Sequence, residues 1–327
     1  MVGEMGSSLS GIKHKLNKTK NKFLRHKILR EVYRKFINTY LRFKKRPSIL
    51  RLEITNVCNA NCIICPRLAH KRKLGFMEFG TFKKIIDSSK DLKIKTVLLQ
   101  NFGEPFLHKS IFKMIGYACK NIENVNVVTN GSLLNNRNIR RLMNTAVKEL
   151  SVSLDSMNPE VYNKIRRNLN FSDVFRNIEN LVLANNSLPK EKRKKIRLTM
   201  CKMDINSAEE NKFVRYCKTN NLIYTINDVT SWAGLIDADT LSKKRPDMDI
   251  KYIFPCKNLF DELVFLWSGE ACICCVDING KFTFGNIRDK SIKEIWNCEK
   301  MCNWRKIHLR GKRNKMEICR NCDYQPW

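Results

Sequence analysis

The stretch that decides the fold is residues 49–66, which read I-L-R-L-E-I-T-N-V-C-N-A-N-C-I-I-C-P. The first seven of these residues form a short, mostly apolar run that predicts a strand. Cys58, Cys62 and Cys65 follow directly, with the spacing C-x3-C-x2-C. Three thiolates on one loop can hold three irons of a 4Fe–4S cube and leave the fourth iron open to a small chelating molecule. On its own, the spacing also fits a zinc site or buried thiols.

Downstream of this loop, short apolar segments alternate with helical segments as far as residue 227. This alternation predicts parallel strands covered by helices. Six units are too few for an eight-unit barrel, so an incomplete barrel or an open twisted sheet fits, with the chemistry at the carboxyl ends of the strands. The expected strands are 49–55, 94–100, 125–129, 149–155, 196–203 and 222–227, and the expected helices are 79–88, 110–120, 136–146, 208–218 and one that starts at Pro159 after an Asn158 cap.

Three more motifs follow expected strands in order: N-F-G-E-P at 101–105, T-N-G at 129–131 and S-V-S-L-D-S at 151–156. Together with the cysteine loop, they resemble the radical S-adenosylmethionine (SAM) superfamily over about residues 49–227. The resemblance implies an α/β fold, a partial (β/α)6 TIM-like barrel. It also implies a 4Fe–4S cluster held by the three cysteines, with SAM on the open iron.

The same resemblance implies a set of SAM contacts. The family's G-G-E-P motif holds the SAM amino group, and Phe102 replaces its first glycine here. The inward polar side chains of the fourth strand reach the methionine end of SAM, and the residue before the third cysteine packs against adenine. The expected contacts are Ile64, Gly103, Glu104, Pro105, Asn130 and Ser153.

The last third of the chain contains a second group of cysteines. With Gly269, G-N-I at 285–287, S-I-K-E-I-W at 291–296 and C-R-N-C at 319–322, it resembles the SPASM/twitch extension, which binds auxiliary 4Fe–4S clusters. The chain stops five residues after the last cysteine, so we expect one auxiliary cluster. Its expected ligands are Cys256, Cys274, Cys319 and Cys322.

Two alternatives concern this second group. Cys275 could replace Cys274 as a ligand, although the spacing from Gly269 favours Cys274. A zinc ribbon could instead form from Cys272 and Cys275 with the C-R-N-C pair, because four thiolates are a usual zinc set. The zinc interpretation leaves Cys256 unexplained.

Composition limits the class of protein. The chain has 327 residues, of which 43% are apolar and 28% charged, so a globular fold is expected. A run of about 18 apolar residues is absent, which excludes a spanning helix, and no secretion signal is recognisable. Fourteen cysteines without such a signal indicate metal or redox chemistry in a reducing compartment. We therefore expect a cytoplasmic location, with peripheral membrane contact as an option.

Positive charge is the other compositional feature: the net charge is +31, and residues 1–49 hold 14 Lys or Arg against two acids. Apolar residues recur at helical spacing from Phe23, so a basic amphipathic helix that ends before Pro47 is expected. We favour packing of this helix on the main domain over attachment to an acidic membrane surface. The expected domains are an N-terminal extension (1–48), the radical SAM core (49–230) and the SPASM/twitch domain (231–327).

The family chemistry is reductive cleavage of SAM to a 5′-deoxyadenosyl radical that abstracts hydrogen from a substrate. We expect a small-molecule, glycan or lipid-linked substrate, with an anionic one favoured by the net charge. The auxiliary cluster is expected to accept an electron, and a flavodoxin or ferredoxin to donate one. The sequence identifies no general base. The alternatives are modification of a ribosomal peptide, or a non-catalytic zinc and nucleic-acid binder; we expect no nucleic-acid partner.

Overall fold

A curved sheet organises the chain, and the computed structural model describes residues 26–243 and 254–324 of it. The sheet has the strand order β6-β5-β4-β3-β2-β1-β7-β8-β9. The first six strands are all parallel, as the alternation predicted. They are β1 (Ile49–Leu52), β2 (Thr96–Leu99), β3 (Asn124–Thr129), β4 (Glu149–Ser153), β5 (Lys195–Lys202) and β6 (Ile223–Asp228).

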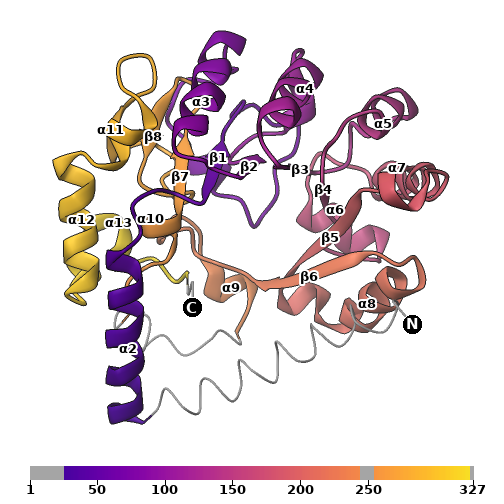
Figure 1. Ribbon diagram of the computed structural model, residues 1–327. Helices are drawn as coiled ribbons and strands as arrows, with labels where there is room; N and C mark the ends of the chain where they lie inside the picture. The colour runs from indigo at the N-terminus through magenta and orange to yellow at the C-terminus, as the bar shows by residue number, and fades with distance from the viewer. Residues whose placement is uncertain (1–25, 244–253, 325–327) are drawn as a thin grey trace.

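Helices cover the outer, convex side of this sheet (Figure 1). Asn158 caps α6 as expected, because its side-chain oxygen accepts the backbone N–H groups of Glu160 and Val161. Helix α7 has no counterpart among the expected helices, and Asn170 caps it in the same way by accepting the N–H of Asp173. The covering helices are α3 (Phe79–Asp91), α4 (Ile111–Asn121), α5 (Asn136–Met143), α6 (Pro159–Ile165), α7 (Phe171–Asn186) and α8 (Glu210–Thr219).

The C-terminal part continues the same sheet. Strand β7 (Glu262–Phe265) pairs in parallel with β1, and β8 (Glu270–Cys272) and β9 (Thr283–Asn286) follow in antiparallel order. All four residues of β7 are buried, and one hydrophobic core extends from the barrel helices to Trp296. Short helices complete this part: α9 (Ala238–Leu241), α10 (Asn258–Asp261), α11 (Ile292–Trp296), α12 (Glu299–Leu309) and α13 (Glu317–Arg320).

Helix α2 (Lys27–Arg42) is the basic amphipathic helix, and it projects away from the barrel (Figure 1). Ile37 and Leu41 are buried against the body, and the Tyr33 ring packs on that of Phe254 with 5.7 Å between centroids. The expected start of this helix at Phe23 lies outside the described residues. Among the helices of the described ranges, none has the length and apolar character needed to cross a bilayer.

Candidate functional site

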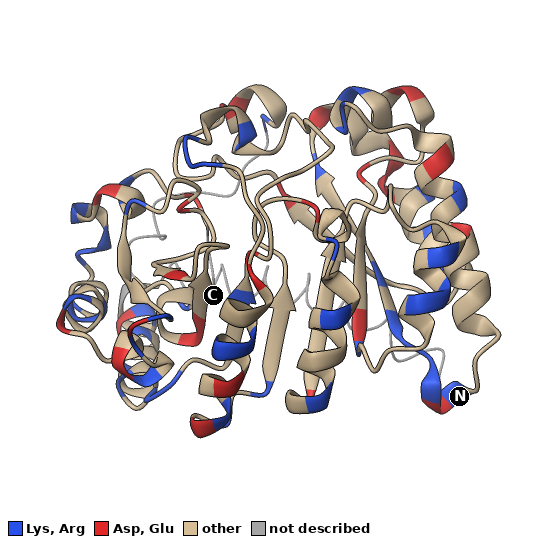
Figure 2. Ribbon diagram, turned by 90° about the horizontal axis from the view of Figure 1, so that it is seen from above, with Lys and Arg blue, Asp and Glu red and all other residues tan. Residues whose placement is uncertain are grey.

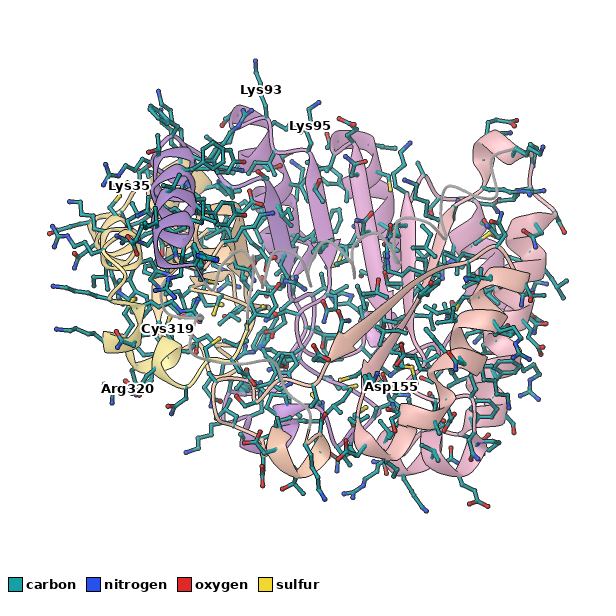
Figure 3. The ribbon with its side chains drawn as sticks, turned by 90° about the horizontal axis from the view of Figure 1, so that it is seen from below. Lys35, Lys93, Lys95, Asp155, Cys319 and Arg320 are labelled. Carbon is teal, nitrogen blue, oxygen red and sulfur yellow. The ribbon has the colours of Figure 1, made fainter. Side chains whose placement is uncertain are left out.

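A cavity of about 1260 Å³ lies at the carboxyl ends of the parallel strands. Its lining includes residues that end or follow each strand, among them Asn101, Asn130, Ser153, Cys201 and Asp228. Figure 3 shows Asp155, which follows β4, at the opposite edge of the sheet from Lys93 and Lys95, which precede β2. The cavity is therefore at the edge where chemistry is expected in a parallel barrel.

The loop after β1 brings Cys58, Cys62 and Cys65 into this cavity. Backbone hydrogen bonds fix the loop to the end of α6: the N–H of Ile63 donates to the carbonyl of Ile165, the last residue of that helix, over 3.0 Å. Burial raises the pKa of the Cys58 thiol and raises that of Cys65 to about 11. Burial therefore disfavours the free thiolates, and bound iron would offset this cost because a thiolate ligand must be deprotonated. The donor set fits an iron–sulfur cluster.

An ion pair stands beside this loop. Nη1 of Arg166 lies 3.7 Å from Sγ of Cys62, and Nε of the same guanidinium donates to Oδ2 of Asp155 over 2.5 Å. Asp155 also accepts the N–H of Cys201, and its backbone carbonyl accepts the amide of Asn206. Asp155 is thus a buried, fully bonded orienter of Arg166, and sequence analysis gave it no such role.

Gly103 and Glu104 connect the ends of β2 and β3. Gly103 has φ +83°, and a Cβ there would stand 2.3 Å from the carbonyl oxygen of Thr55, so only glycine fits. The carboxylate of Glu104 accepts the hydroxyl of Thr129 over 2.7 Å and the N–H of Asn130 over 2.8 Å. Burial raises the pKa of Glu104. The backbone of the 101–105 motif therefore approaches the loop after β1 closely at Gly103, the glycine that this motif keeps.

Five of the six expected SAM contacts line the cavity. Ile64, Gly103, Glu104, Asn130 and Ser153 are in its lining. The sixth, Pro105, is buried at the start of a short 3-10 turn, where it is not in the lining.

Trp232 is a lining residue that sequence analysis missed. Its Nε1 donates to the carbonyl of Ile64 over 2.8 Å, and its ring lies 5.6 Å from that of Phe102. The backbone is left-handed at Trp232 (φ 50°) and Ala233 (φ 60°), which is strained for residues with a side chain. Asp323 holds this turn, because its Oδ2 accepts the N–H of Ser231 over 2.6 Å. In the sequence, Trp232 stands before Ala233 and Gly234, and this local pattern does not predict its contacts with Ile64 and Phe102.

The second group of cysteines surrounds a smaller cavity in the C-terminal part. All four expected auxiliary ligands line it, together with His308. Burial raises the pKa of Cys256 to about 11 and that of Cys319 to about 12. His308 contacts both segments: its Nδ1 accepts the N–H of Cys256 over 3.1 Å, and its Nε2 lies 3.6 Å from Sγ of Cys319. The four expected auxiliary ligands that line this cavity are Cys256, Cys274, Cys319 and Cys322.

Two further cysteines of this region, Cys272 and Cys275, do not line the small cavity, although Cys275 is within electrostatic range of Cys256 and Cys322. Cys275 lines the large cavity, whereas its neighbour Cys274 lines the small one. Cys272 is fully buried in an apolar cluster with Val264 and Leu266. A zinc ion needs four thiolates at about 2.3 Å from one point. Of the four cysteines of the zinc-ribbon interpretation, only Cys319 and Cys322 line the small cavity. Across residues 26–243 and 254–324, no three His, Cys, Asp or Glu side chains are arranged to hold a single metal ion.

Charge in the large cavity is balanced, in contrast to the whole chain. Its described lining holds four arginines, five acids and no lysine. Arg51 is paired with Glu262 over 2.6 Å and also donates to Gln100. Figure 2 shows Lys and Arg distributed over many outer segments. The surplus positive charge is therefore outside the cavity, and the lining gives no basis for selecting an anionic substrate.

Comparisons with known proteins agree with this geometry. The model of the radical SAM superfamily matches residues 52–187, and that of the SPASM iron–sulfur cluster-binding domain matches residues 256–323. The SAM-dependent 2-deoxy-scyllo-inosamine dehydrogenase of Niallia circulans is 22% identical over 84% of this chain and 92% of its own length. A probable GTP 3′,8-cyclase of Methanocaldococcus jannaschii is 32% identical, but over 44% of this chain and 47% of its own length.

Solved structures show the same fold. BtrN in complex with AdoMet and 2-DOIA superposes with a TM-score of 0.60 at 20% identity, over 85% of this chain and 93% of BtrN. Streptococcus suis SuiB bound to its precursor peptide SuiA gives a TM-score of 0.65 at 14% identity, over 87% of this chain and 72% of SuiB. The radical SAM domain binds a 4Fe–4S cluster and SAM, and the SPASM domain binds auxiliary iron–sulfur clusters. The chain therefore belongs to the radical SAM superfamily and is a radical SAM enzyme with a C-terminal SPASM domain.

Proposed function

We propose that Cys58, Cys62 and Cys65 hold the SAM-binding cluster and that the large cavity presents a small molecule to it. When bound, the cluster and SAM supply a 5′-deoxyadenosyl radical, which removes hydrogen from an unactivated C–H bond. The observation that carries this proposal is that the three thiols share one cavity with five of the expected SAM contacts. That cavity has room for both SAM and a substrate.

Residues around the cluster loop then have separate tasks. Gly103 and Asn130 bring backbone close to the expected SAM position, and Glu104 keeps the two turns together. Ile64 and Trp232 form an apolar wall, joined by the hydrogen bond from the indole to the Ile64 carbonyl. Such a wall excludes water from a reactive intermediate. Arg166 places a fixed positive charge 3.7 Å from Sγ of Cys62, beside the proposed cluster.

The four thiols of the small cavity are proposed to hold one auxiliary 4Fe–4S cluster. Such a cluster would supply an acceptor for one electron. With one hydrogen atom given to the radical and one proton released to solvent, the substrate would complete a two-electron oxidation. Support comes from the backbone, because the consecutive residues Cys274 and Cys275 line the small and the large cavity respectively. A substrate in the large cavity would therefore be separated from a ligand of the auxiliary cluster by adjacent residues of one backbone segment.

The proposed substrate is a polyhydroxylated small molecule, a glycan or a lipid-linked sugar, oxidised at an alcohol carbon. The dehydrogenase named above, which matches most of this chain, supports this class. The balanced lining offers both carboxylates and guanidinium groups to hydroxyl or amino substituents. A flavodoxin or ferredoxin is the proposed electron donor.

Anaerobic reconstitution tests this proposal. The protein should be brown and bind about eight irons per chain, as two cubes require, and it should release 5′-deoxyadenosine when a strong reductant and SAM are added. Cys62→Ala should abolish the release, whereas Cys119→Ala, on α4 and outside both cavities, should not. Cys319→Ala should still cleave SAM but should not form oxidised product. A colourless protein that never forms 5′-deoxyadenosine would contradict the proposal.

A further inference from the structure

The exposed side of α2 has a continuous apolar stripe. Ile28 is 79% exposed, Val32 61%, Phe36 69% and Tyr40 51%. Phe43, directly after the helix, is 75% exposed. The first four residues recur at every fourth position, so they form one row along the helix. Large apolar side chains exposed together in this way indicate an interaction surface.

This stripe is distinct from the face that packs on the body. Ile37 and Leu41 are each 2% exposed and supply the packed face. At about 100° per residue, the exposed stripe covers about 120° of the helix circumference and lies beside the packed face. The fold therefore uses only part of the apolar surface of α2, and packing against the C-terminal part, through Tyr33 on Phe254 and Asn38 on the Leu309 carbonyl, does not account for the remainder.

Cations border the stripe on its other side. Lys35 and Arg42 are exposed on α2. Lys45 and Arg46, in the segment that follows the helix, are exposed as well. Lys35 lies on α2 at the margin of the molecule (Figure 3). The sequence before the helix adds further cations and has no acid between Glu4 and Glu31. An apolar stripe bordered by cations matches a surface that has acidic groups above an apolar layer.

We propose that α2 binds the surface of a bilayer that contains anionic lipids. Val32 and Phe36 enter the boundary between headgroups and acyl chains, while Lys35 and Arg42 contact acidic headgroups. A second copy of this chain fits the stripe less well, because pairing two chains of net charge +31 brings like charges together. This inference is independent of the proposed reaction, since no residue of α2 lines either cavity.

Vesicle co-sedimentation of the full, reconstituted chain tests the inference. The probes are vesicles of phosphatidylcholine alone and of phosphatidylcholine with phosphatidylglycerol. The double variant Val32→Asp/Phe36→Asp should lower the partition coefficient on anionic vesicles at least tenfold, or about 1.4 kcal/mol. The matched control is Leu183→Asp. Leu183 lies on α7, away from the stripe, and is 65% exposed, so this variant should bind the vesicles as the parent does. Iron content and circular dichroism verify that each variant folds.

Three results would each overturn the inference. Binding that persists in the double variant would mean that positive charge alone attracts the protein to the vesicles. A parent chain that ignores both vesicles but sediments as a dimer, while the double variant is monomeric, would assign the stripe to a second copy. A monomeric parent that ignores both vesicles would leave the stripe without a lipid partner. Release of 5′-deoxyadenosine should be equal in all three proteins.

Discussion

Replacement of Asp323 by alanine tests the link between the C-terminal part and the cluster loop. Asp323 follows directly after Cys322, and its Oδ2 holds the N–H of Ser231 at 2.6 Å. The next residue, Trp232, contacts the cluster loop through the carbonyl of Ile64. One carboxylate therefore connects a proposed auxiliary ligand to the wall of the proposed SAM site.

The size of the effect follows from this geometry. A hydrogen bond to a charged group contributes about 1.5–3 kcal/mol. Left-handed backbone at Trp232 and Ala233 opposes the turn by roughly 1–2 kcal/mol for each residue. The indole hydrogen bond contributes about 1 kcal/mol. The Ser231 hydroxyl also donates to the Asn321 carbonyl, over a longer 3.3 Å, and the N–H groups of Gly234 and Ile236 donate to the Ser231 carbonyl. The bond to the Asp323 carboxylate is the strongest of these contacts, because its acceptor is charged. We therefore expect Asp323→Ala to release the turn and to weaken SAM binding about 10- to 100-fold.

Equilibrium dialysis of SAM against anaerobically reconstituted protein measures this change in Kd. The matched control, Asp323→Asn, keeps an acceptor oxygen for Ser231 and should bind SAM within about threefold of the parent. Iron content must be determined for both variants because Cys322 is adjacent. An Asp323→Ala protein with full iron content and a parental Kd would refute the reasoning.

Three further predictions follow from the site. Cys274→Ser should lose about half of the bound iron on reconstitution, whereas Cys275→Ser, which alters the other cavity, should retain it; equal losses would contradict the assignment. Gly103→Ala should lower the thermal unfolding temperature and the iron content, because its Cβ would collide with a backbone carbonyl; unchanged melting would refute the steric argument. Burial, with Arg72 and Arg67 nearby, lowers the pKa of His70 from 6.5 to about 4, so the unfolded chain binds the proton first as pH falls. The free energy of unfolding should then decrease between pH 6.5 and 4 by up to about 1.4 kcal/mol per pH unit, and urea titrations of His70→Gln should show a smaller decrease.

Local signals account for what the sequence predicted. The six parallel strands and the Asn158 cap depend on neighbouring residues, so periodicity and capping rules found them. Cys274 lines the small cavity and Cys275 the large one, and the ligand role that the spacing from Gly269 favours for Cys274 stays a prediction.

The features that were missed depend on distant partners. Strand β7 reads as one apolar segment among many, and only its pairing with β1 makes it part of the sheet. Trp232 is fixed by contacts to Ile64 and, through Ser231, to Asp323, which sequence spacing does not reveal. Helical periodicity predicted an amphipathic helix but could not tell which of its apolar residues the body would cover.

The pairing of β1 with β7 also affects how the chain matures on the ribosome. Ile49 is opposite Glu262, a residue that is synthesised 213 positions later. At a translation rate of about 5–20 residues per second, the edge of β1 that pairs with β7 stays unpaired for roughly 10–40 seconds. An open strand edge can recruit other chains, so the nascent barrel is exposed to aggregation throughout that interval. Slow decoding or premature termination before residue 265 should therefore produce insoluble material, and chaperones that shield strand edges should improve the yield.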